Sequence, residues 1–209
     1  MELADPWFFE DVCYEEGYTA VCGVDEAGAG PLAGPVYAAA VILPHGASIA
    51  GLNDSKKCTA RQRDRLYEEI VKTALAYAVA SVDAAEIDEI DILNARMKAM
   101  QAAIDALPVP ADFALIDGNR DHGSRIAIRT AHKTVVGGDG RSASIAAASV
   151  LAKVSRDRYC TGVMATAYPA YRFEKHKGYG TKLHYEMLDK YGASPLHRKS
   201  FLKKWEGAK

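Results

Sequence analysis

The chain has 209 residues, of which 49% are hydrophobic and 25% charged, and its formal net charge is −1. This length and composition predict one sizeable core, and no run of about 18 apolar residues is present, which excludes a membrane-spanning helix and a membrane partner. The acidic first residues do not resemble a secretory signal, and the four scattered cysteines form no CxxC pair. We therefore expect a cytoplasmic protein with reduced thiols and no zinc site.

Charge is distributed unevenly along the chain. No Lys or Arg precedes Lys56, and that stretch contains nine Asp and Glu. Residues 171–209 contain ten Lys and Arg against four Asp and Glu. A basic C-terminal surface suits a polyanionic partner such as nucleic acid, although a solvated lysine-rich surface explains the same pattern.

Hydrophobic spacing predicts secondary structure along most of the chain. Taken in chain order, the expected elements are a strand at 19–27, a strand at 36–44, a helix at 58–75, a strand at 76–83, a helix at 88–107, a strand at 112–119, at least one strand within 124–136, a long Ala-rich helix at 142–167 and a short helix at 181–192. This order predicts a mixed α/β fold around one sheet. We expect a single domain over 1–209, with a catalytic core at about 1–167 and a basic C-terminal part at about 168–209.

Carboxylates recur where the expected strands and helices meet. Asp25 and Glu26 end the first strand, Asp117 ends the strand "FALID", and Asp139 precedes the Ala-rich helix. Ligands collect at strand ends in open α/β sheets, and gathered carboxylates repel one another unless a cation neutralises them. Oxygen ligands without His or Cys select Mg²⁺ or Mn²⁺, and two such ions would suit phosphoryl transfer. Taken singly, Asp117-Gly118 and Asp139-Gly140 are also ordinary turn sequences.

A glycine-rich loop follows the paired acids. Gly28-Ala29-Gly30 exposes backbone N–H groups that a sugar or phosphate can approach closely. The segment "GAGPLAG" only partly fits a dinucleotide-binding fingerprint, because Pro31, Pro35 and a second expected strand follow where that fingerprint requires a helix. A structural turn without a ligand is the remaining interpretation.

Several long segments resemble bacterial ribonuclease HII in the order in which that family carries them. They are "GVDEAGAGPLAGPVYAAAVIL", "LNDSKKCTARQRDRLYEEI", "FALIDGN", "SASIAAASVLAKVSRDRY", "YPAYRFEKHKGYGTKLHYEML" and "GASPLHRKSF". The resemblance covers nearly the whole chain. It implies a ribonuclease H-like fold, with a mixed central sheet flanked by helices and a small C-terminal helical part.

The resemblance also implies an activity and a set of site residues. The family's enzymes cleave the RNA strand of RNA/DNA hybrids and incise DNA at embedded ribonucleotides, leaving 3′-hydroxyl and 5′-phosphate ends, with Mn²⁺ or Mg²⁺. The family's catalytic, metal-binding acids fall on Asp25, Glu26, Asp117 and Asp139, and its sugar-packing tyrosine on Tyr179. We expect water to attack in line at the phosphodiester 3′ to a ribonucleotide, with Asp25 contacting both ions. The expected partners are RNA/DNA hybrid and ribonucleotide-containing duplex DNA, bound by a monomer.

One departure from the family pattern bears on substrate recognition. The family's loop reads Gly-Arg-Gly, whereas this chain has Ala29 between Gly28 and Gly30. We expect weaker contact with the backbone at the RNA–DNA junction, because the family's arginine helps to hold it. Two other functions are therefore considered: a hybrid-binding variant with impaired cleavage, and a nucleotide-cofactor enzyme built on the glycine loop.

Further substrate contacts are expected from basic, polar and aromatic side chains. The interleaving of basic residues with Tyr179 in "EKHKGYG" suits phosphate contact combined with stacking on a sugar or base. The full set of expected substrate-binding residues is Gly28, Ala29, Gly30, Lys56, Ser144, Ser149, Lys153, Lys177 and Tyr179. For most of these, a solvated turn or ordinary helix packing is the alternative interpretation.

Overall fold

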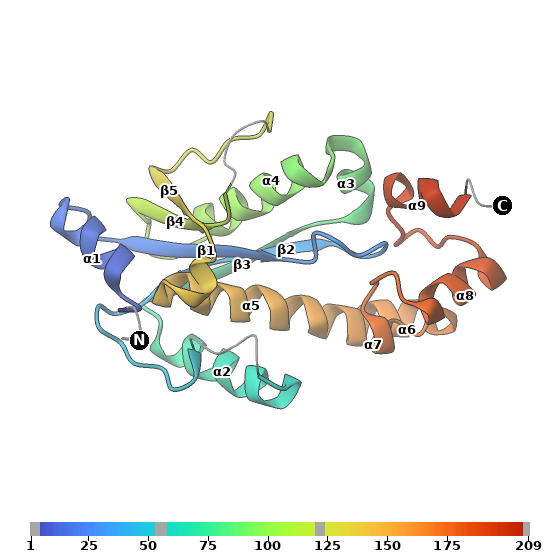
Figure 1. Cartoon of the computed structure of the whole chain (residues 1–209), viewed down its shortest axis with the longest axis horizontal. Helices are drawn as coiled ribbons and strands as arrows, with labels where there is room; N and C mark the ends of the chain where they lie inside the picture. Colours follow the sequence, from blue (N-terminus) through green and yellow to red (C-terminus); the bar gives the residue numbers. More distant parts are fainter. Residues whose placement is uncertain (1–4, 53–57, 120–123, 207–209) are drawn as a thin grey trace.

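The structure is a computed structural model that describes residues 5–52, 58–119 and 124–206. Within these residues, five strands form one sheet in the order β3-β2-β1-β4-β5 (Figure 1). The strands are β1 (Val21–Ala27), β2 (Val36–Ile42), β3 (Ala76–Val82), β4 (Phe113–Asp117) and β5 (His132–Val135). The first three pair antiparallel, whereas β1–β4 and β4–β5 pair parallel, so the sheet is mixed, as the sequence predicts.

Helices cover both faces of this sheet (Figure 1). On one face lie α3 (Ala84–Ile90) and α4 (Ile92–Asp105), and on the other lie α2 (Ala60–Thr73) and α5 (Ala143–Tyr159). The remaining helices are α1 (Phe8–Glu15), α6 (Ala165–Ala167), α7 (Phe173–His176), α8 (Lys182–Tyr191) and α9 (Lys199–Glu206). Among the described residues, no helix has the length and apolar character needed to cross a bilayer.

Local sequence explains several helix boundaries, and two expected helices are corrected by the structure. Thr59 caps α2 through a reciprocal capping box with Gln62. The helix expected at 88–107 is instead two helices, because Asp91 adopts a left-handed φ of 68°. Its carboxylate then accepts the Asn94 N–H and caps α4. The helix expected at 142–167 runs as α5, a π-helical segment Cys160–Met164, and α6.

The C-terminal segments pack into a hydrophobic cluster of their own. Its buried members include Met164, Tyr171, Phe173, Leu188 and Leu202. The cluster also takes in Leu32 and Ala33 from the loop after β1, so it is joined to the sheet at that loop. The proposed division near residue 168 remains a prediction.

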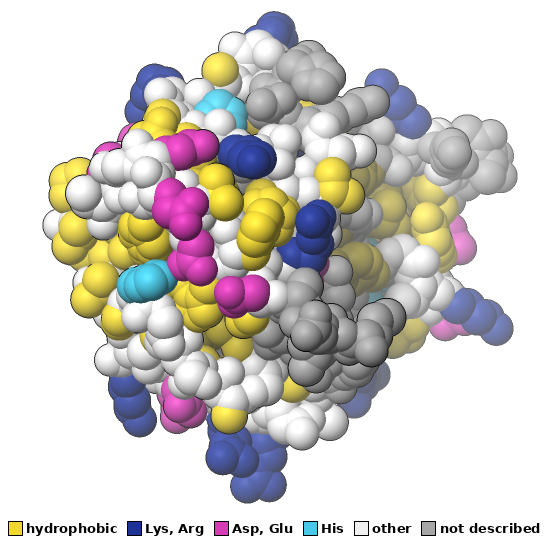
Figure 2. Space-filling view, turned by 60° about the vertical axis from the view of Figure 1, so that its left-hand side comes forward, with side chains coloured by type: hydrophobic (Ala, Val, Ile, Leu, Met, Phe, Trp, Pro, Cys, Tyr) yellow, Lys and Arg dark blue, Asp and Glu magenta, His cyan; other side chains and the backbone are white. Residues whose placement is uncertain are grey.

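The opposite end of the molecule, which carries α1, has a different surface. Figure 2 shows a run of acidic side chains across this face, with basic side chains both beside that run and at the margins. This distribution follows from a sequence with no Lys or Arg before Lys56. A polyanion would therefore meet less repulsion at other faces than at this one.

The backbones of β1 and α5 approach each other closely at Gly23. A Cβ added at Gly23 would meet the Ser144 carbonyl carbon at 2.1 Å and the Ile145 nitrogen at 2.2 Å. Gly23→Ala should therefore force α5 away from the sheet and lower the free energy of unfolding by about 3 kcal/mol or more. Gly162→Ala is the matched control, because no other atom lies within 4 Å of its added Cβ. Equal melting temperatures for the two variants would contradict this packing.

Candidate active site

The adjacent acids Asp25 and Glu26 point to opposite faces of the sheet, because side chains alternate along a strand. The even positions Cys22 and Val24 pack in the core on the α4 side, so Glu26 faces α4 and forms an ion pair with Arg96, with Nη2 to Oε1 at 2.5 Å. Asp25 faces α5 and accepts a hydrogen bond from Ser149. The pair thus connects the two helical layers at the end of β1.

Parallel pairing places Asp117 beside this pair. Val24 is in register with Ile116, so the next step along the two strands brings Asp25 level with Asp117. The Gly138 N–H donates to Asp117 Oδ1 at 2.6 Å, which links β4 to the turn before α5. Carboxylates 92 positions apart in the chain therefore meet because β1 and β4 are parallel neighbours.

Asp139 lies in the 3₁₀ turn Gly138–Gly140 and is buried. It sits one residue beyond the Gly138 N–H that holds Asp117. Among the described residues, no three His, Cys, Asp or Glu side chains are arranged closely enough to hold a metal ion. The structure brings Asp25 and Asp117 side by side and turns Glu26 toward Arg96. The assignment of all four acids as metal ligands remains a prediction.

The electrostatics of the acids reflect burial and mutual repulsion. Burial raises the pKa of Asp25 well above its ordinary value, and the charges of Glu26 and Asp117 raise it further. Hydrogen bonds from Ser149 and from the Glu26 N–H act in the opposite direction. Burial also raises the pKa of Glu26, although the Arg96 guanidinium partly offsets this effect. Such a site favours either a proton or a cation as its counterion.

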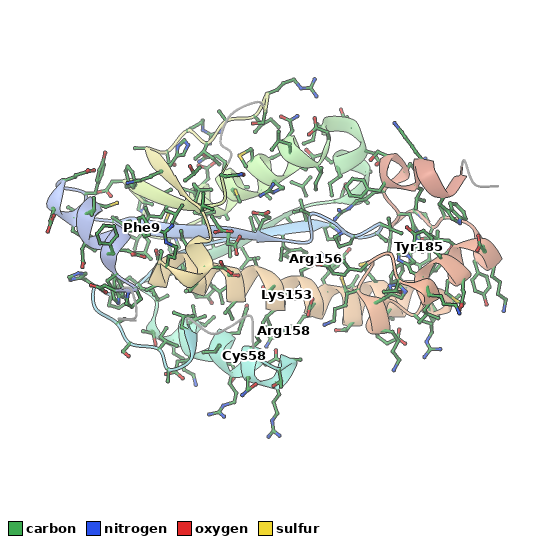
Figure 3. All side chains as sticks on the ribbon, in the orientation of Figure 1. Phe9, Cys58, Lys153, Arg156, Arg158 and Tyr185 are labelled. Carbon is green, nitrogen blue, oxygen red and sulfur yellow. The ribbon has the colours of Figure 1, made fainter. Side chains whose placement is uncertain are left out.

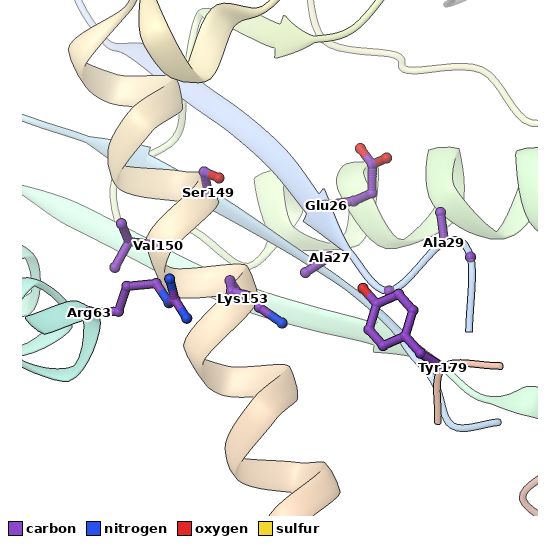
Figure 4. A pocket seen from close by; sticks show the side chains of 10 residues that line it. Glu26, Ala27, Ala29, Arg63, Ser149, Val150, Lys153 and Tyr179 are labelled. Atoms are coloured by element: carbon purple, nitrogen blue, oxygen red, sulfur yellow. The ribbon is translucent and has the colours of Figure 1, made fainter. Parts of the chain in front are cut away.

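A cleft of about 470 Å³ opens beside the acids (Figure 4). Ser149, Val150 and Lys153 line it from α5, and Arg63 lines it from α2. The end of β1 with its glycine loop, and Tyr179 from the C-terminal part, complete the lining: Glu26, Ala27, Gly28, Ala29, Gly30 and Tyr179. Six of the predicted substrate-binding residues therefore share one cleft.

Of the remaining predicted contacts, Ser144 and Lys177 do not line this cleft. Ser144 is buried, and its hydroxyl donates to Glu10 of α1 at 2.5 Å, so it fixes the start of α5 and is not positioned to contact substrate. Lys153 and Lys177 both donate to Asp157, at 2.7 and 2.5 Å, so their charges are partly neutralised. Lys56 lies outside the described residues.

Two buried arginines hold the glycine loop from behind. Arg198 donates to the carbonyls of Gly28, Ala29 and Gly34 at 2.7, 2.9 and 2.9 Å. Arg156 donates to the Ala33 and Pro35 carbonyls at 3.3 and 3.1 Å. Figure 3 shows Arg156 on α5, near the end that approaches the C-terminal helices. Because these contacts occupy the carbonyls, the loop presents a fixed backbone to the cleft.

Gly28 is required at its position for two reasons. Its φ of +93° is left-handed, and an added Cβ would meet the Arg156 Nε at 2.0 Å. The loop then leads directly into β2 and not into a helix. This connection excludes the helix-borne pyrophosphate site of a dinucleotide-binding fold, so the nucleotide-cofactor interpretation of the loop is wrong.

Tyr179 is held by a chain of buried histidines. The Ser194 N–H donates to His197 Nδ1 at 2.9 Å, so neutral His197 carries its proton on Nε2. That proton is donated to His184 Nε2 at 2.9 Å, and His184 Nδ1 then donates to the Tyr179 carbonyl at 2.9 Å. The Arg156 guanidinium lies 5.6 Å from the Tyr179 ring centroid. The ring, 42% exposed, is thus anchored from behind.

Comparison with known proteins places this site in a family. A sequence model of ribonuclease HII matches residues 22–204. The chain belongs to the ribonuclease HII family. It is 51% identical to the ribonuclease HII of Caldicellulosiruptor bescii over 93% of this chain and 92% of that one. It is 52% identical to that of Idiomarina loihiensis over 87% and 94% of the two chains. It is therefore a ribonuclease H-type hydrolase, as the resemblance predicts.

Solved structures of ribonucleases H share the fold. The ribonuclease H2 of Pyrococcus horikoshii aligns with a TM-score of 0.72 and 23% identity over 91% of this chain and 98% of that chain. A Bst ribonuclease HIII solved in complex with Mn²⁺ aligns with a TM-score of 0.64 and 20% identity, over 93% and 71% of the two chains. The predicted ribonuclease H-like fold is confirmed.

Four arginines of the ribonuclease HII site were not predicted from the sequence: Arg63, Arg96, Arg156 and Arg198. Arg63 lies in a helix whose spacing was explained by packing alone. Arg96 meets a residue 70 positions earlier, and Arg198 meets one 170 positions earlier. Arg198 lies within "GASPLHRKSF", and the resemblance of this segment to the family is the sequence signal that could have found it.

The histidine chain predicts a pH-dependent stability. Burial lowers the pKa of His184 and of His197 to about 4, from 6.5. The unfolded chain therefore binds protons below pH 6.5 that the folded one does not, so stability is complete above pH 6.5 and falls toward pH 4. The melting temperature of the wild type should decrease over this window. His197→Asn should start lower but decrease less steeply, whereas the exposed His45→Gln should follow the wild type. If the melting temperatures of His197→Asn and wild type decreased equally steeply with falling pH, the assignment of this pH dependence to the buried histidines would be contradicted.

Proposed function

We propose that this ribonuclease HII is a metal-dependent endonuclease that hydrolyses the RNA strand of RNA/DNA hybrids. We further propose that it incises duplex DNA at embedded ribonucleotides and leaves 3′-hydroxyl and 5′-phosphate ends. The observation that carries the proposal is the level placement of Asp25 and Asp117 at the ends of β1 and β4, beside the cleft. Ligands of open α/β sheets bind at the strand ends, so a cation held by these acids would lie where a substrate phosphate can also bind.

The chemistry of the residues present suits a divalent cation. The donor set consists of carboxylate oxygens, which suits Mn²⁺ or Mg²⁺. Among the described residues, Glu26 Oε2 is a buried carboxylate oxygen without a hydrogen-bond partner, and such an acceptor is costly unless a cation or proton satisfies it. The repulsion among Asp25, Glu26 and Asp117 would be relieved in the same way. Two ions, held by these acids and Asp139, are proposed.

In the proposed reaction, the ions supply positive charge to the phosphoryl oxygens and lower the pKa of water. The acids of this chain hold those charges in place, and the buried position of Asp25 excludes bulk water from one side of the site. The arginine-fixed loop would offer backbone groups to the 2′-hydroxyl, which distinguishes RNA from DNA. Tyr179 would pack against the neighbouring sugar. The monomeric state and cytoplasmic location also remain predictions.

Asp25→Asn tests the role of the acids directly. It removes one negative charge and keeps the shape of the side chain, so cleavage should fall on the order of a thousandfold, with nucleic-acid binding largely retained. The measurement is gel-resolved cleavage of duplex DNA carrying one ribonucleotide, with Mn²⁺ and Mg²⁺ in turn. Asp64→Asn, which alters an exposed ion pair with Arg158, is the control and should cleave normally. A fully active Asp25→Asn would refute the assignment.

Ala29→Arg tests the loop. Ala29 lines the cleft, so a guanidinium there should add a charge-assisted contact to a phosphate at the RNA–DNA junction. One such contact predicts about a tenfold lower KM for a substrate with a single ribonucleotide. Ala29→Gln supplies a long side chain without charge and should change KM little. An unchanged KM in Ala29→Arg would show that the loop needs no arginine here.

A further inference from the structure

Arg96 is a cation placed directly on one of the proposed catalytic acids. Its Nη2 lies 2.5 Å from Glu26 Oε1, and the Glu26 side chain is only 12% exposed. A buried carboxylate needs a counterion, and Arg96 supplies it from α4, the helix that Glu26 faces. Figure 4 shows the Glu26 side chain rising from β1 toward α4, on the side away from Ser149 and Lys153.

The ion pair between Arg96 and Glu26 uses only one of the two hydrogen bonds that it could form. A guanidinium and a carboxylate can form two parallel hydrogen bonds, but here one oxygen of Glu26 is bound. Among the described residues, Glu26 Oε2 and Arg96 Nε are both buried polar atoms without hydrogen-bond partners. Each side of the pair therefore has capacity for another partner: the glutamate for a cation and the arginine for an anion.

A guanidinium and a divalent cation on the same carboxylate repel each other. The repulsion between a double and a single charge a few ångströms apart amounts to several kcal/mol even at the effective dielectric of a protein surface. A cation entering at Glu26 therefore either binds weakly or displaces Arg96. Displacement is feasible because the Arg96 side chain is 28% exposed, whereas the neighbouring Ala95 and Met97 hold α4 in the core.

We propose that Arg96 exchanges Glu26 for a backbone phosphate of the nucleic acid, and thereby couples cation binding to nucleic-acid binding. Phosphate is the matching anion, because its oxygens accept both arms of a guanidinium. With Arg96 on a phosphate, Glu26 is released to the cation, and each ligand strengthens the binding of the other. The inference rests on the proposed function, since it requires that Glu26 is a cation ligand.

The test is calorimetric titration of Mn²⁺ into the intact protein, with and without an all-DNA duplex that lacks a ribonucleotide. Arg96→Gln should bind Mn²⁺ about tenfold more tightly than wild type without DNA, because the competing charge is gone. DNA should tighten Mn²⁺ binding several-fold in wild type and not in Arg96→Gln. Arg96→Lys keeps the charge and should bind as weakly as wild type without DNA.

Lys98→Gln is the matched control, because it removes the same charge from α4 at a side chain paired with Glu86. It should behave as wild type. Binding of Mn²⁺ by Arg96→Gln that is equal to or weaker than wild type would overturn the exchange, as would an equal effect of DNA in both. The same Mn²⁺ titration of Asp25→Asn measures the cations that bind to DNA and to other parts of the protein. If this variant binds Mn²⁺ as tightly as wild type, the proposed metal site itself fails.

Discussion

The parallel pairing of β1 with β4 is the constraint on which this site depends. It sets Asp25 level with Asp117, and the alternation of side chains along β1 then sends Glu26 to the other face. Two like charges side by side at a strand end are unfavourable, and burial increases the cost. A bound cation can offset this repulsion between the carboxylates. Neighbouring groups such as Ser149, Gly138 and Arg96 each offset part of it.

The glycine loop after β1 is held in place by the C-terminal part. Arg198 and Arg156 bind loop carbonyls, and the Leu32 N–H donates to the Gly178 carbonyl at 2.8 Å. An added Cβ at Gly178 would meet the Ala33 oxygen at 2.3 Å, so the two backbones are in direct contact. The basic C-terminal sequence therefore contributes to the site mainly by fixing the loop and Tyr179. Its Lys177 is partly neutralised by Asp157.

Sequence patterns predicted the strands of the sheet and the helices α2, α4, α5 and α8, because these depend on local periodicity, but they did not predict α1, α3 or α9. They also placed the four acids at element ends, while the role of these acids as ligands remains a prediction. They could not give the break at Asp91, which requires a left-handed residue inside a helical pattern. Ser144 was misplaced because its partner Glu10 lies 134 positions away. Arg96 and Arg198 act through contacts of the same long-range kind. Such contacts are set by topology, and no spacing within one segment reports them.

The distance in sequence between Gly28 and Arg198 bears on how the enzyme is made. The ribosome adds Arg198 170 residues after Gly28, and only then can the loop carbonyls be bound. The His197–His184 contact with Tyr179 is likewise completed late in synthesis. A nascent chain therefore carries its acids and its sheet before it carries an ordered loop. The glycine loop of this enzyme, which is synthesised on an RNA template, is therefore fixed only after Arg198 has been added.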